Sequence, residues 1–109
     1  MNDKFKTAWS KDTCYPPLKE KWSEDCPELG QCAVTALVIQ DNFGGELAFN
    51  KELNHYWNVL PNGKEIDLTR AQFPDVKEVT ITKIAKREDF GEDVIRRYKL
   101  LKKRIRENR

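Results

Sequence analysis

The chain has 109 residues, of which 39% are hydrophobic and 35% charged, and its formal net charge is +2. This length has room for one modest hydrophobic core, so we expect a single domain over residues 1–109. The start of the chain lacks a continuous apolar run, and no segment approaches the ~20 apolar residues of a membrane span. The composition therefore predicts a cytoplasmic protein with no membrane partner.

The amino-terminal part is expected to form short helices. Residues 3–10 fit one helix, because Phe5 and Trp9 lie four positions apart ahead of a double-proline turn. A second short helix can start at Pro17, since proline is favoured at a first helical position, and run through Trp22. The stretch that follows, SEDCPELG, is typical of a loop.

The segment from Gln31 to Asn42 is predicted to be a buried helix. Its apolar residues cover nearly the whole circumference, as in helices that are packed on all sides. The glycines at 44 and 45 then end it. Cys32 stands at the start of this helix, where unpaired N–H groups and the helix dipole favour the thiolate form of a cysteine. The same N–H groups, that of Cys32 foremost, can act as oxyanion donors.

Strands are predicted at 46–49, 54–60 and 64–69, the last two forming a hairpin. An irregular connection over 70–79 follows, with a short strand at 79–84. This arrangement puts a small antiparallel sheet after the buried helix.

The turn of the hairpin decides whether His55 and Asp67 lie on the same face. A two-residue Asn-Gly turn would put them on opposite faces. Pro61 instead suits position i+1 of a type I turn, and Gly63 suits the left-handed residue that follows, which together give a three-residue loop with a bulge. In this register Asp67 falls opposite Trp57 and is a diagonal neighbour of His55. The turn chemistry therefore predicts a His–Asp pair, with the other face packed on the core.

From Glu88 the chain is predicted to form a long amphipathic helix with apolar residues at i, i+4, i+7 and i+11, namely Val94, Tyr98, Leu101 and Ile105. Residues 94–109 carry eight Lys or Arg and one Glu, a charge that could attract nucleic acid. However, acidic residues at the helix start and basic residues toward its end follow the helix dipole. The basic residues also surround the apolar stripe, so we expect no specific nucleic-acid binding.

The residues expected to carry chemistry are Cys32, His55 and Asp67. In such a set the carboxylate orients the imidazole, and the imidazole takes the thiol proton. The chain has one histidine, so any Cys-His chemistry must use it. Candidates for substrate binding or for a second oxyanion donor are Gln31, Trp57, Asn58 and Trp22.

The stretch from Trp22 to Phe73, with PELGQCAVTALVIQDNFGGEL and HYWNVLPNGKEIDLTR, resembles the YunG family of small, functionally uncharacterised bacterial proteins. More distantly, Gly-x-Cys at a helix start, His-x-Trp-Asn, a glycine turn and Ile-Asp-Leu-Thr are similar to the transglutaminase-like branch of the papain-like cysteine enzymes. That resemblance implies an α+β, papain-like fold in which a helix carrying Cys32 packs on an antiparallel sheet. It also implies Cys32 as nucleophile, His55 as base, Asp67 as orienting carboxylate and Trp57 as an aromatic beside the site.

The preferred function is cysteine-dependent hydrolysis or acyl transfer at an amide- or ester-type bond, through a thioester at Cys32. The substrate would be a small molecule or peptide, and no cofactor or metal is expected. One alternative is a zinc site, although cysteine spacings of twelve and six fit it poorly; its ligands would be Cys14, Cys26, Cys32 and His55. The other is a papain-like binding or interaction module without catalysis, because fold does not guarantee function.

Overall fold

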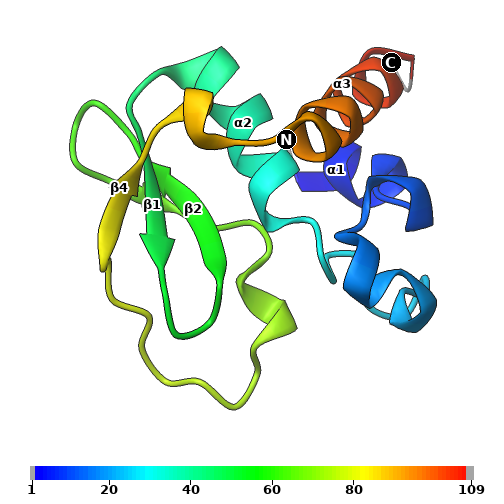
Figure 1. Cartoon of the computed structure of the whole chain (residues 1–109), viewed down its shortest axis with the longest axis horizontal. Coiled ribbons are helices and arrows are strands. Elements are labelled where there is room, and N and C mark those ends of the chain that lie inside the picture. Colours follow the sequence, from blue (N-terminus) through cyan, green and yellow to red (C-terminus); the bar gives the residue numbers. More distant parts are fainter. Residues whose placement is uncertain (1, 108–109) are drawn as a thin grey trace.

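The computed structural model describes residues 2–107. Its helices and strands in chain order are α1 (Asn2–Ala8), α2 (Cys32–Phe43), β1 (Glu46–Asn50), β2 (His55–Val59), β3 (Glu65–Ile66), β4 (Lys83–Ala85) and α3 (Glu92–Glu107). Short 3-10 helices occupy Lys11–Thr13, Pro16–Lys21, Arg70–Gln72 and Arg87–Asp89. The strands form one antiparallel sheet in the order β3-β2-β1-β4, and Figure 1 labels β2, β1 and β4. The predicted α+β class, with a small antiparallel sheet and a C-terminal helix, is confirmed.

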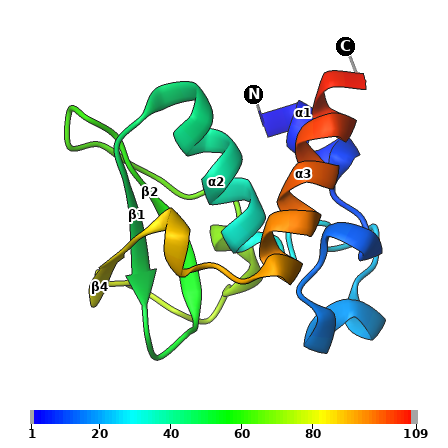
Figure 2. The ribbon, with the colours of Figure 1, turned by 45° about the horizontal axis from the view of Figure 1, so that its top comes forward.

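Helix α2 is the centre of the molecule. Figure 2 shows it between the sheet on one side and the pair of helices α1 and α3 on the other. Because it is covered on both sides, residues 34–39 are all buried, and Leu37 is completely inaccessible. The expectation of a buried helix is confirmed for residues 34–39, whereas residues 41–43 at its end are exposed; its first residue is Cys32.

The amino-terminal segment packs on α2 from the side opposite the sheet. Phe5 and Trp9 are buried in the core, and the Trp9 indole N–H donates to Thr35 Oγ1 at 2.9 Å. The helix predicted over 3–10 ends at Ala8, and the one predicted from Pro17 is a 3-10 helix over Pro16–Lys21.

The hairpin of β2 and β3 has the predicted register. Asn58 pairs with Ile66, Val59 pairs with Glu65, and the Leu60 N–H donates to the Lys64 carbonyl at 2.8 Å. This is the register of the three-residue loop. The face opposite the His–Asp pair packs on the core through Tyr56, Ile66 and Leu68.

Two strand predictions are wrong in extent. The strand predicted over 64–69 covers only Glu65–Ile66, because Asp67 Oδ1 accepts from the Thr69 N–H at 3.2 Å and bends the backbone there. The strand predicted over 79–84 is instead Lys83–Ala85. Its partner β1 pairs with it only through residues 47–49, so the residues before 83 extend past the ladder.

Helix α3 begins at Glu92, four residues later than predicted, after a 3-10 helix over Arg87–Asp89. Its apolar stripe joins the core through Tyr98 and Leu101. None of the helices in the described part of the chain is both long and apolar enough to cross a bilayer.

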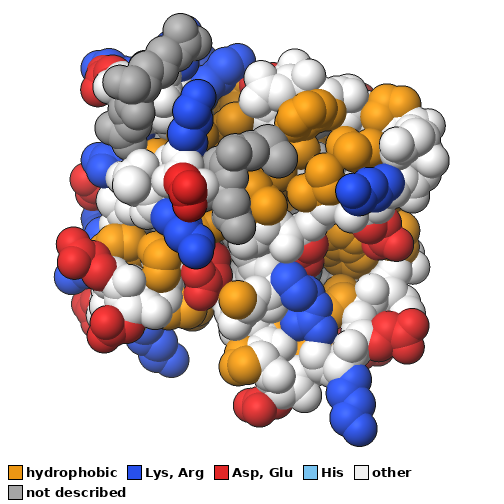
Figure 3. Space-filling model, turned by 180° about the vertical axis from the view of Figure 1, so that it is seen from behind, with side chains coloured by type: hydrophobic (Ala, Val, Ile, Leu, Met, Phe, Trp, Pro, Cys, Tyr) orange, Lys and Arg blue, Asp and Glu red, His pale blue; other side chains and the backbone are white. Residues whose placement is uncertain are grey.

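Several basic side chains of α3 bind partners within the chain. Arg97 is 3% exposed and donates to the Thr13 carbonyl, Arg104 donates to the Ala8 carbonyl, and Lys102 pairs with Asp41. On the face drawn in Figure 3, Lys and Arg side chains are interspersed with Asp and Glu. The absence of nucleic-acid binding stays a prediction.

Candidate functional site

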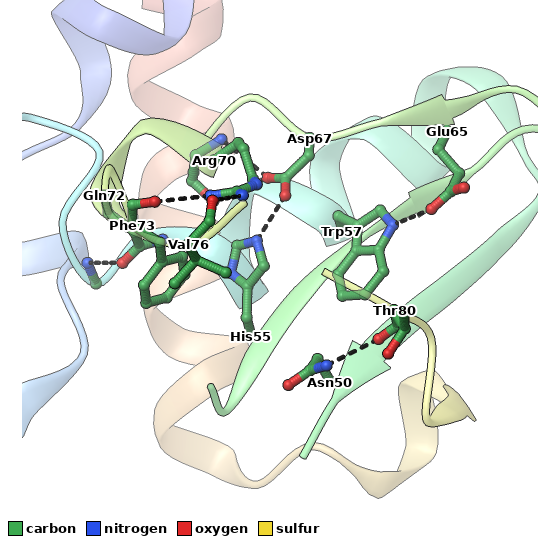
Figure 4. A network of polar contacts seen from close by, with 12 residues as sticks. Asn50, His55, Trp57, Glu65, Asp67, Arg70, Gln72, Phe73, Val76 and Thr80 are labelled. Atoms are coloured by element: carbon green, nitrogen blue, oxygen red, sulfur yellow. Dashed lines mark hydrogen bonds and ion pairs between the residues drawn. The ribbon is translucent and has the colours of Figure 1, made fainter. Parts of the chain in front are cut away.

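His55 is the first residue of β2, and its imidazole is held on several sides. The ring is completely buried, and Nε2 lies 2.7 Å from Asp67 Oδ2 (Figure 4). The Trp57 indole stacks on the ring at 5.5 Å between centroids, and the Phe73 ring meets it edge-on at 4.9 Å. These contacts fix the orientation of the imidazole, and the bond to Asp67 leaves Nδ1 as the nitrogen available to another group.

Asp67 is fixed in turn by the bend that ends β3. While one carboxylate oxygen meets His55, Oδ1 accepts from the backbone N–H and the hydroxyl of Thr69 at 3.2 and 3.4 Å. The side chain is 16% exposed. The bend that shortens the strand thus orients the carboxylate toward the histidine.

The 3-10 helix after this bend brings Phe73 to the histidine. Arg70 donates to the carbonyls of Phe73, at 2.8 Å, and of Val76, and so closes the turn after the 3-10 helix (Figure 4). The sequence analysis treated this segment as an irregular connection.

Cys32 is placed by a close approach of two loops. Gly30, two residues earlier, has φ +71°, and a Cβ there would lie 2.5 Å from the sulfur of Cys14. The Gln31 side chain does not cap α2, so the first N–H groups of the helix keep no side-chain acceptor. The Cys32 thiol is partly exposed beside these groups.

The electrostatics of His55 reflect both neighbours. Burial lowers the pKa of His55, but the hydrogen bond with Asp67 and the interaction with Cys32 raise it more, to about 9. The charged imidazolium is therefore favoured at neutral pH. Nδ1 is buried and makes no hydrogen bond within the described residues, although Cys32 is close enough to act on the ring.

A cavity of about 500 Å³ opens beside Cys32. Most of its lining is apolar, with Leu29, Tyr56, Phe73 and Phe90 among the side chains. Burial raises the pKa of Tyr56, whose side chain lines this cavity together with Cys32. The thiol is thus accessible from a cavity large enough for a small organic group.

The whole chain, residues 1–109, matches the family described as YunG protein. The chain belongs to the YunG family. It is 44% identical over 71 residues to "Uncharacterized protein YunG" of Bacillus subtilis strain 168, a match that covers 63% of this chain and 56% of that protein. The match therefore spans little more than half of the relative's length. No solved structure matches the chain.

In this YunG-family chain, two predicted oxyanion donors have partners in the core. The Gln31 side-chain amide donates to the Ser10 carbonyl at 3.0 Å, and the Asn58 amide donates to the Ala36 carbonyl at 2.9 Å. Both residues are at most 1% exposed. Because neither residue lines the cavity beside Cys32, we do not retain either as an oxyanion donor.

Of the two tryptophans predicted to lie at the site, Trp57 is there and Trp22 is not. Trp57 lies beside His55 as predicted, and its indole N–H donates to Glu65 Oε1 at 2.7 Å. Trp22 is not brought to the site; its indole N–H donates to the Pro27 carbonyl, and it does not line the cavity at Cys32.

The other two thiols are not arranged for chemistry at this site. Cys14 is buried, and burial raises its pKa. Cys26 donates to Glu28 Oε1 at 3.0 Å, and burial and this carboxylate raise its pKa to about 11. Among residues 2–107, no three His, Cys, Asp or Glu side chains converge as metal ligands, so the four proposed zinc ligands do not form a site.

Gln72 is a site residue that the sequence analysis did not identify. It lines the cavity together with Cys32, and its Oε1 accepts from the Gly30 N–H at 3.3 Å. Its only signal in the sequence is its place five residues after Asp67, in a segment with no periodic pattern.

Proposed function

We propose that this protein is a papain-like, transglutaminase-like cysteine hydrolase or acyltransferase. The observation that carries the proposal is the state of His55: its Nε2 is bound to Asp67, and Cys32 is the one other group within the described residues whose interaction raises the pKa of this ring, whose buried Nδ1 meets no other hydrogen-bond partner. A buried unpaired ring nitrogen costs free energy unless a reacting group uses it. A thiol at the start of an uncapped helix is the group this nitrogen would serve.

In the proposed resting state the proton of the Cys32 thiol has already moved to His55 Nδ1, which pairs a thiolate with the imidazolium. The sulfur attacks the carbonyl carbon of an ester or amide, and the carbonyl electron pair moves to the oxygen. When the tetrahedral intermediate collapses, the imidazolium returns the proton to the leaving alkoxide or amine, and a thioester remains. Water or an amine then attacks the thioester, giving its proton to His55, and regenerates the thiolate.

The cavity beside Cys32 favours an apolar acyl group. Its aromatic and aliphatic lining would bury such a group, at about 25 cal/mol for each Å² removed from water. A small molecule or a peptide with an apolar side chain next to the scissile bond fits this description. We further propose a cytoplasmic location, where thiols stay reduced; the three cysteines are free.

The test is alkylation by iodoacetamide at pH 7, with the modified cysteine identified by mass spectrometry. Cys32 should react fastest, because Cys14 is buried and Cys26 has a pKa of about 11. A free thiol with a pKa near 8.5 is only about 3% thiolate at pH 7, so His55→Ala should slow labelling by up to ~30-fold.

A second measurement reads the chemistry itself. After incubation with p-nitrophenyl butyrate, an acyl adduct should appear on Cys32 and be absent in Cys32→Ser. If Cys32 labels no faster than a free thiol and forms no adduct, the non-catalytic binding module replaces the enzyme.

A further inference from the structure

Gln72 carries a buried hydrogen-bond donor that nothing satisfies. Its Nε2 is inaccessible to solvent and has no partner within the described residues. A buried amide N–H without an acceptor costs roughly 1–3 kcal/mol. Such a group in a side chain that lines a cavity points to an acceptor on a bound molecule.

The orientation of the Gln72 amide is fixed by its other end. Its Oε1 lies 3.3 Å from the Gly30 backbone nitrogen, which can only donate. A flipped amide would set two donors against each other at this distance, so the nitrogen must be the unpaired atom. The same bond ties the Gln72 side chain to the loop two residues before Cys32.

Cys32, which lines the same cavity, has a second unpaired donor. Cys32 is the first residue of α2, whose N-terminus receives no side-chain cap, and its backbone N–H has no intrahelical acceptor. Gln31 and Asn58, the other nearby amides, donate to carbonyls of the core. Neither Gln31 nor Asn58 lines the cavity, and Asn54, which does, is exposed to solvent, so Gln72 is the amide of the lining whose nitrogen is buried without a partner.

We propose that the Gln72 side-chain amide is the second oxyanion donor of the site, acting together with the Cys32 backbone N–H; this inference rests on the proposed function. When the Cys32 sulfur bonds to the acyl carbon, the C=O electron pair moves to the oxygen, which then accepts from both N–H groups. When that pair re-forms the carbonyl, the bond to the leaving group breaks and the oxygen leaves the donors. Gln72 gains and loses no proton.

The experiment compares two reactions of Cys32 in one protein. Acylation by p-nitrophenyl butyrate forms an oxyanion, whereas displacement of iodide from iodoacetamide by the same sulfur does not. Gln72→Met removes the amide at similar volume, and Gln72→Glu keeps an oxygen for the Gly30 N–H but has no donor. Gln40→Met is the matched control, because Gln40 lies near the other end of α2 and donates to the Gly45 carbonyl.

Both Gln72 variants should acylate ~100-fold more slowly or worse, after division by their own iodoacetamide rates, which is the loss typical of an oxyanion donor. Gln40→Met should match the wild type. A merely structural role would slow both reactions together and leave the ratio unchanged, which would overturn the proposal. If either Gln72 variant keeps the wild-type ratio, Gln72 is not an oxyanion donor. The proposed cysteine enzyme is then unaffected. If wild-type Cys32 is not acylated at all, both proposals fail.

Discussion

Asp67→Asn tests the electrostatic basis of the site. Asparagine keeps an oxygen for the Thr69 N–H, so the bend after β3 is preserved, but it removes the charge that faces His55 Nε2 at 2.7 Å. In the wild type the pKa of His55 is raised from 6.5 to about 9, a difference worth up to ~3 kcal/mol for a fully buried ring. Cys32 contributes to the same shift, so the part due to Asp67 is smaller.

The sign of the pH dependence follows from the direction of this shift. The folded-state pKa of His55 lies above the unfolded value, so its stabilisation is complete below pH ~6.5 and is lost as the pH rises through about 9. Asp67→Asn should therefore be destabilised most near pH 6, and its deficit in the free energy of unfolding should shrink toward pH 10 by no more than ~3 kcal/mol. Urea denaturation at several pH values measures this deficit.

Proton NMR gives the same answer independently, because the chain contains one histidine. The His55 ring signals should titrate near pH 9 in the wild type and at a clearly lower pH in Asp67→Asn. Asp25→Asn, a change of the same kind in an exposed turn, should leave the titration unchanged. A wild-type ring that titrates near 6.5, or one that ignores Asp67→Asn, would refute the reasoning.

Two further predictions concern the frame of the site. Gly45→Ala should destabilise the protein by several kcal/mol, because a Cβ there would lie 2.2 Å from the Val59 carbonyl oxygen. Gly63→Ala, which has a similar φ and open space around it, should cost only the ~1–2 kcal/mol of a left-handed alanine. Thermal unfolding of both variants separates the cost of the steric clash from the cost of the left-handed backbone. Asn58→Ala should cost ~0.5–1.5 kcal/mol by removing the buried hydrogen bond that its amide donates to the Ala36 carbonyl, with little change in Cys32 alkylation at low temperature. A selective loss of ester acylation would instead restore Asn58 as an oxyanion donor.

The parts of the fold that follow local rules could be predicted from the sequence. The all-round apolar pattern of α2 and the Pro-Asn-Gly turn depend on neighbouring residues alone, and the turn fixes which residues share a face with His55. The contact of His55 with Asp67 follows from that register. The site geometry was therefore predictable where one hairpin determines it.

Other features depend on contacts between distant segments. Gln31 and Asn58 resemble free amides in the sequence, but their acceptors are carbonyls of residues 21 and 22 positions away. Gln72 was missed for the same reason, since its bond to Gly30 spans 42 positions. The end of β3 was missed because the Asp67 side chain, and not a neighbouring strand, accepts the Thr69 N–H. Strand propensity does not take such local side-chain hydrogen bonds into account.

The pattern of unpaired buried atoms ties the two proposals together. Proteins satisfy nearly all buried polar groups, because each unpaired donor costs roughly 1–3 kcal/mol. Within the described residues, the buried side-chain nitrogen or oxygen atoms that lack a partner are His55 Nδ1 and Gln72 Nε2. One belongs to the imidazole whose pKa Cys32 helps to raise, and the other to a side chain that lines a cavity with Cys32. Chance packing gives no reason for both atoms to belong to residues grouped around Cys32, whereas the proposed acyl-transfer site would use both, one to exchange a proton and one to bind an oxyanion.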